Sequence, residues 1–84
     1  MTKTEFVTWA KERGWEQDKR GHLQKTIAFP GNSILNRTYR FKLSPSHVRY
    51  ELKADIGNHN EWLRLRGAFF KDLHINEDGK VSGL

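Results

Sequence analysis

The feature that most constrains the fold of this chain is a pair of alternating segments in the middle of the sequence. In residues 37–43 (RTYRFKL) and 47–53 (HVRYELK), apolar and polar side chains alternate one by one. Ser44-Pro45-Ser46 separates them, and proline fixes a backbone angle that suits a turn. Successive side chains of a β-strand point to opposite faces. The pattern therefore predicts an antiparallel hairpin with one face buried.

A short amphipathic helix is expected over residues 3–13. Thr2 followed by Glu5 fits a capping box, in which each side chain accepts a hydrogen bond from the other residue's backbone N–H. The apolar residues at helical spacing are Phe6, Val7 and Ala10. Gly14 supplies the left-handed residue that ends a helix, and Trp15 is expected to fold back over the helix as its hydrophobic contact.

A further strand is expected over residues 22–29, after a polar connection at 16–21. The residues on its apolar face are Leu23, Ile27 and Phe29. Lys25 interrupts that face, which favours a position at the edge of the sheet or at a strand end. Turn residues at 30–33 (PGNS) end this strand.

The segment 61–70 (EWLRLRGAFF) follows a polar loop at 54–60 and fits either a strand or a helix. A glycine in a helix interior costs about 1 kcal/mol relative to Ala, so Gly67 favours the strand, with a bulge near it. This strand would turn Leu63 and Leu65 inward. The side chains that it would turn outward are Trp62, Arg64 and Arg66.

These elements predict an α+β fold in one domain over residues 1–84. We expect one N-terminal helix packed on one face of a four- to five-stranded, mainly antiparallel sheet. Leu73 and Ile75 alternate, and NEDG at 76–79 predicts a closing hairpin turn. With 84 residues, the chain is too short for two independent cores.

The positive charge of the chain is concentrated in its middle. The net charge is +5, but residues 19–71 hold eleven Lys or Arg against three acids, a net of +8. A field of this kind attracts polyanions, which include nucleic acid, acidic proteins and membrane surfaces.

The strand patterns predict that this charge lies on the sheet face opposite the helix. The candidate nucleic-acid-binding residues there are Arg40, Lys42, Arg49, Lys53, Trp62, Arg64 and Arg66. Their like charges repel, and phosphates along a strand would relieve that repulsion, with Trp62 as a surface for base stacking. A solvated face that resists edge-to-edge aggregation explains the same pattern without a polyanion.

The leading hypothesis is a small, non-enzymatic nucleic-acid-binding or accessory protein. The alternative is a protein-interaction module, such as an inhibitor or assembly adaptor from a mobile element, that binds an acidic or aromatic-binding protein partner. Its aromatic anchors would be Trp62, Phe69 and Phe70. A homodimer through the strand 22–29 or the C-terminal hairpin is compatible with their unpaired edges.

The sequence predicts no enzyme active site, metal or cofactor. It has no cysteine, and its four histidines have no short spacing of the kind that metal ligands show. No stretch approaches the ~20 apolar residues of a membrane span, and the N-terminal segment carries Glu5 and Glu12 where a signal peptide would be apolar. We therefore expect a cytoplasmic protein without a membrane partner.

Residues 5–25 resemble part of one enzyme family. A helix, Gly14-Trp15 and then Lys19-Arg20-Gly21-His22 on an incoming strand are similar to the small mRNA-interferase toxins of the HicA type. In that family a strand histidine is catalytic, so the resemblance implies a small ribonuclease that uses His22. The similarity covers about a quarter of the chain, and the family's Ser before the histidine and its closing helix are missing.

Overall fold

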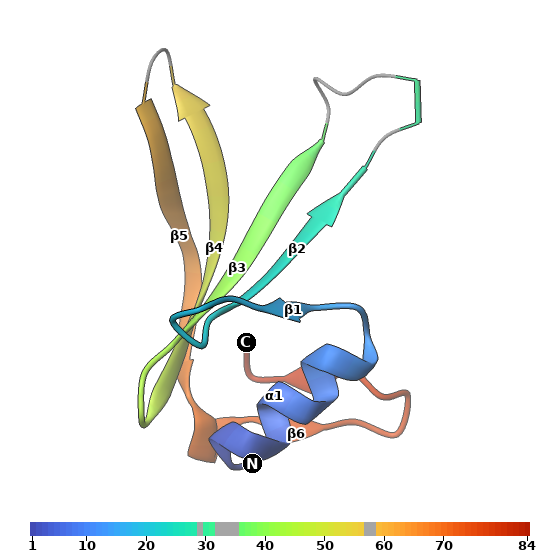
Figure 1. The fold of residues 1–84 in the computed structure, drawn as a ribbon. Helices are drawn as coiled ribbons and strands as arrows, with labels where there is room; N and C mark the ends of the chain where they lie inside the picture. The colour runs from blue at the N-terminus through green and yellow to red at the C-terminus, as the bar shows by residue number, and fades with distance from the viewer. Residues whose placement is uncertain (29, 32–35, 57–58) are drawn as a thin grey trace.

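The computed structural model describes residues 1–28, 30–31, 36–56 and 59–84. These residues form one α-helix, a five-stranded antiparallel sheet and a separate two-stranded sheet (Figure 1), which confirms the predicted α+β fold. The elements are α1 (Lys3–Glu12), β1 (Glu16–Gln17), β2 (Leu23–Ile27), β3 (Arg37–Leu43), β4 (His47–Ile56), β5 (His59–Phe69), the 3-10 helix η2 (Phe70–Asp72), β6 (His74–Ile75) and β7 (Val81–Ser82). In the described part of the chain, no helix is both long and apolar enough to cross a membrane.

The helix α1 begins as predicted at Lys3 and ends at Glu12, one residue before the predicted end, with Arg13 as its C-cap. The Thr2 hydroxyl accepts a hydrogen bond from the Glu5 N–H at 3.1 Å, and the Glu5 carboxylate accepts one from the Thr2 N–H at 2.9 Å. Gly14 has a φ of +89°, and the Trp15 N–H donates to the Ala10 carbonyl at 3.1 Å. The local sequence therefore specifies both ends of the helix.

The strands of the large sheet follow chain order, from β1 to β5, and all neighbours are antiparallel. The predicted hairpin is confirmed, and the segment 61–70 begins as a strand rather than a helix. The loop predicted at 54–60 was wrong for its described residues, because β4 continues through 54–56 and β5 begins at 59. Regular strand pairing therefore extends well beyond the alternating segment.

The outer strand β1 is a second difference from the sequence prediction. Glu16 and Gln17 were expected in a polar connection, but they pair with Gln24 and Leu23 of β2. The remainder of β2, which includes Lys25, lies at the edge of the sheet, as predicted. Phe29 and residues 32–33 of the predicted turn lie outside the described residues.

A bulge in β5 changes the facing of its middle residues. Tyr50 of β4 pairs with Arg66, whereas the next residue, Glu51, pairs with Arg64, so Leu65 has no partner. An extra residue on one strand shifts the alternation of its side chains. Arg64 therefore lies on the face of Glu51 and Arg66 on the face of Tyr50. The bulge falls two residues before its predicted position, and the prediction that Arg64 and Arg66 share a face was wrong.

The core lies at one end of the sheet, together with α1, β1 and the C-terminal hairpin (Figure 1). Its buried residues are Phe6, Ala10, Leu23, Phe41, Leu43, Val48, Phe70 and Leu73. The ring of Phe6 in α1 contacts Phe41 of β3 edge-on, with centroids 4.9 Å apart. Trp15 packs against this core, with its ring centroid 4.1 Å from that of Phe41. Phe70, predicted to be exposed, was also placed wrongly, because it is only 4% exposed in this core.

Beyond the core, the sheet divides into two arms (Figure 1). The pairing of β3 with β4 ends at Tyr39 and Leu52. The pairing of β2 with β3 continues to Ile27 and Arg37, and that of β4 with β5 continues to residues 56 and 59. The hairpins β2–β3 and β4–β5 therefore extend away from the helix as separate pairs of strands.

Candidate nucleic-acid interface

The sheet face that points away from the core carries most of the predicted site. Strand pairing places Lys42 beside Arg49, Glu51 between Arg40 and Arg64, and Lys53 beside Trp62. Directly paired residues in neighbouring strands share a face. We call this surface the basic face, and its predicted members are Arg40, Lys42, Arg49, Lys53, Trp62 and Arg64.

Arg40 is held in place at the centre of the basic face. Its Nε and Nη2 donate to Oε1 of Glu51 at 2.9 and 2.7 Å. Its guanidinium carbon also lies 4.1 Å from the ring centroid of Trp62, a cation–π distance. The Arg40 and Glu51 side chains are only 14% and 7% exposed. Arg40 therefore neutralises Glu51 and is not a free cation.

Four cations of the basic face have no acidic partner among the side chains that the structure describes. They are Lys42, Arg49, Lys53 and Arg64. Among the described residues, no carboxylate lies within ion-pair distance of any of them. Arg49 is half-buried and the other three are exposed. Neighbouring strands lie about 4.8 Å apart, which is less than the Debye length of about 8 Å at physiological salt, so these charges interact with one another.

Gly67 brings two of these cations to the same part of the sheet. It pairs with Arg49 across β4 and β5. A Cβ atom at this position would lie 3.0 Å from Nη2 of Arg64, so the Arg64 guanidinium folds over the space that the glycine leaves. Because Gly67 has no side chain, the Arg64 guanidinium lies close to Arg49 and Lys42. The alternation of the sequence alone did not indicate this grouping of positive charge.

His22 lies at the β2 side of the basic face and has a structural hydrogen bond. Its Nδ1 accepts a hydrogen bond from the Leu43 N–H at 3.0 Å. Burial lowers the pKa of His22 below its usual 6.5, and the positive charges of Arg40 and Lys42 lower it further against the opposing effect of Asp18. Both effects favour a neutral ring at pH 7, which is the form that can accept this hydrogen bond.

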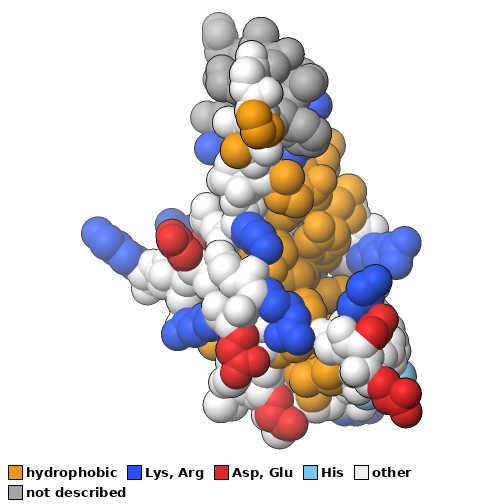
Figure 2. Space-filling view, turned by 90° about the vertical axis from the view of Figure 1, so that its right-hand side faces the viewer, with side chains coloured by type: hydrophobic (Ala, Val, Ile, Leu, Met, Phe, Trp, Pro, Cys, Tyr) orange, Lys and Arg blue, Asp and Glu red, His pale blue; other side chains and the backbone are white. Residues whose placement is uncertain are grey.

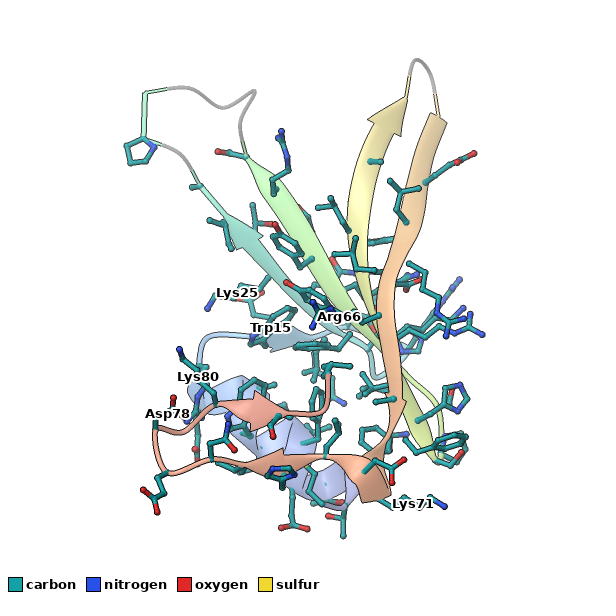
Figure 3. The ribbon with its side chains drawn as sticks, turned by 180° about the vertical axis from the view of Figure 1, so that it is seen from behind. Trp15, Lys25, Arg66, Lys71, Asp78 and Lys80 are labelled. Carbon is teal, nitrogen blue, oxygen red and sulfur yellow. The ribbon has the colours of Figure 1, made fainter. Side chains whose placement is uncertain are left out.

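Arg66 lies on the other face of the sheet, because the bulge at Leu65 turns it there. Its Nη1 donates to the Leu84 carbonyl at 3.3 Å. It pairs with Tyr50, whose ring centroid lies 6.5 Å from that of Trp15, and Figure 3 labels Arg66 and Trp15 in the view from behind. Arg66 is therefore removed from the predicted nucleic-acid-binding set.

The C-terminal hairpin contains a histidine–hydroxyl contact that the sequence did not indicate. His74 of β6 pairs with Ser82 of β7, and Ser82 Oγ lies 2.7 Å from His74 Nε2. Nucleophilic catalysis also needs a group that orients the base. No carboxylate of the described residues hydrogen-bonds to His74, so the pair is a cross-strand contact.

Neither metal ligation nor a known relative adds to the description of this site. Within the described ranges, no three or more His, Cys, Asp or Glu side chains are grouped so that they could hold a metal ion. Comparisons with protein-family models, curated proteins and solved structures find no match to this chain. The functional argument rests on the basic face.

Proposed function

We propose that this protein is a small, non-enzymatic nucleic-acid-binding protein that uses its basic face. The observation that carries the proposal is the imbalance of charge on that face. Among the described side chains, four cations have no acidic partner there, and Arg40 already neutralises Glu51. A bound phosphate backbone would replace mutual repulsion with attraction and would release counterions.

The chemistry of the basic face favours binding that tolerates many sequences. Lys and Arg contacts to phosphates position a nucleic acid but do not read its bases. One face of the Trp62 ring is covered by the Arg40 guanidinium, so base stacking would use the remaining surface of this Arg–Trp pair. If each of the four free cations neutralises one phosphate, log K should fall against log salt with a slope of about −3 to −4.

The test is fluorescence anisotropy with labelled single-stranded DNA, duplex DNA and RNA at several salt concentrations. The variant Lys42→Glu/Arg49→Glu reverses two adjacent cations of the basic face and leaves the Arg40–Glu51 pair intact. Lys71→Glu/Lys80→Glu is the control, because it makes the same change of net charge at two exposed lysines outside the basic face, one in η2 and one just before β7. We expect Lys42→Glu/Arg49→Glu to lose at least about tenfold in affinity and to show a shallower salt slope, with little change in the control.

Two results would reject the proposal. One is the absence of binding by the unmodified protein at low salt, which would leave the basic face as solvated surface. The other is an equal loss in Lys71→Glu/Lys80→Glu and in Lys42→Glu/Arg49→Glu, which would mean that only the net charge matters. If the proposal holds, we expect the protein to act in the cytoplasm, and imaging of a tagged protein would check that location.

A further inference from the structure

An apolar strip lies on the core-side face of the sheet, beyond the end that α1 contacts. Tyr39, Leu52 and Leu63 form one row across β3, β4 and β5, and Ile27 lies on the same face of β2. Leu63 is 43% exposed and Ile27 is 47% exposed. Figure 2 shows a strip of hydrophobic side chains with Lys and Arg side chains on both sides. We call these four residues the apolar strip.

A single short helix leaves this strip uncovered because the sheet is too long for it. The eleven residues of β5 span about 36 Å at ~3.3 Å per residue, whereas a helix is about 10–12 Å wide. The buried residues of α1, Phe6 and Ala10, belong to the core at one end of the sheet. In the described part of the chain, no second α-helix lies beside α1.

The charges around the apolar strip are mostly positive. Lys25 shares this face with Tyr39, and Arg66 follows Leu63 on β5. The Lys25 ammonium donates to the Arg13 carbonyl at 2.8 Å, and Arg66 donates to the Leu84 carbonyl. A carbonyl oxygen satisfies a donor but does not cancel its charge.

From this combination we propose that the apolar strip is the docking surface for an amphipathic helix of a partner protein, with acidic residues beside its apolar stripe. Its paired row, Tyr39, Leu52 and Leu63, crosses three strands, about 10 Å at ~4.8 Å per step, which matches the width of one helix. Glu61 is the one described acid on this face near the strip. A second copy of the chain would therefore bring Lys25 and Arg66 of both copies together, whereas acidic flanks complement them.

The experiment uses three labelled synthetic peptides of about 18 residues, a length at which a helix can form on binding. The first has a Leu stripe at helical spacing with Glu beside it. The second replaces each Glu by Lys, and the third keeps Glu but replaces each Leu by Ser. Fluorescence anisotropy measures the binding of each peptide to the full chain and to its variants.

The variants are Ile27→Gln and Leu63→Gln, with Ile75→Gln as the matched control. All three side chains are large, apolar and between 43% and 48% exposed, so the substitutions leave the buried core intact. Ile75 lies in β6, away from the strip. Lys42→Glu/Arg49→Glu is also included, because the acidic peptide could be attracted to the basic face instead of the apolar strip. This variant removes that attraction and leaves the apolar strip unchanged.

We expect the Leu/Glu peptide to bind at least about tenfold more tightly than the other two. Ile27→Gln and Leu63→Gln should each weaken that binding several-fold, whereas Ile75→Gln and the basic-face variant should leave it nearly unchanged. Equal binding of the Glu and Lys peptides, or equal losses in Ile75→Gln, would overturn the proposal. So would self-association in sedimentation that Leu63→Gln abolishes, because a second copy would then cover the strip.

Discussion

Replacing Glu51 by Gln should lower the free energy of unfolding and raise the affinity for nucleic acid in the same variant. Removal of one partner from a buried ion pair costs about 3–5 kcal/mol. Gln can still accept a hydrogen bond from Arg40, and Trp62 still covers the guanidinium, so we expect a smaller cost than this, about 2–3 kcal/mol. A domain of this size has about 4–12 kcal/mol in total, so the loss is large.

The effect on binding has the opposite sign because of the same contact. In the unmodified protein, Glu51 takes two hydrogen bonds from Arg40 and cancels its charge. In the variant, Arg40 becomes a fifth uncompensated cation of the basic face. If it neutralises one more phosphate, the slope of log K against log salt should steepen by about 0.7–0.9.

Urea denaturation followed by circular dichroism measures the stability, and anisotropy at several salt concentrations measures the binding. Glu61→Gln is the control, because Glu61 is an exposed acid on the other face of β5. It makes the same change of net charge, and exposed substitutions usually change stability by less than about 0.5 kcal/mol. Equal stability of the two variants, or equal gains in affinity, would refute the argument from the buried pair.

Three further substitutions test the local and core contacts. Lowering the pH from about 7.5 to about 5.5 should reduce the urea midpoint, because His22 has a lowered pKa in the folded protein. As the pH falls, the unfolded chain therefore takes up a proton on His22 before the folded chain does. The stability that is present above pH 6.5 is lost as the pH falls toward the folded pKa. His22→Gln should show a smaller fall over that range, and an unchanged fall would contradict the assignment. Gly14→Ala should cost about 1 kcal/mol in denaturation, because Ala disfavours a φ of +89° even though its Cβ would meet the Lys25 side chain only at an ordinary contact distance of 3.8 Å; a neutral result would mean that the helix end relaxes. Phe6→Ala should cost about 3–5 kcal/mol and weaken the near-ultraviolet dichroism of the core, because Phe6 is fully buried between Phe41 and Phe70.

Short-range patterns in the sequence determined the elements whose causes are local. The capping box at Thr2 and Glu5 and the left-handed Gly14 bound the helix, since each acts within one turn of chain. The alternation at 37–43 and 47–53 determined a hairpin and which of its side chains face the core. A shift of the strand register by one residue would turn every apolar side chain of that strand to the solvent. Five of the six predicted cations therefore share the basic face.

Tertiary structure decided the features that depend on contacts between distant residues. A bulge at Leu65 moved Arg66 to the other face, and no property of β5 alone specifies where its pairing with β4 skips a residue. The pairing of Arg40 with Glu51 changed a predicted phosphate ligand into a buried structural contact. Phe70 entered the core because the chain turns into η2 just after β5. Alternation predicts which residues share a face of one strand, but strand register and the packing of distant elements determine which charges remain free.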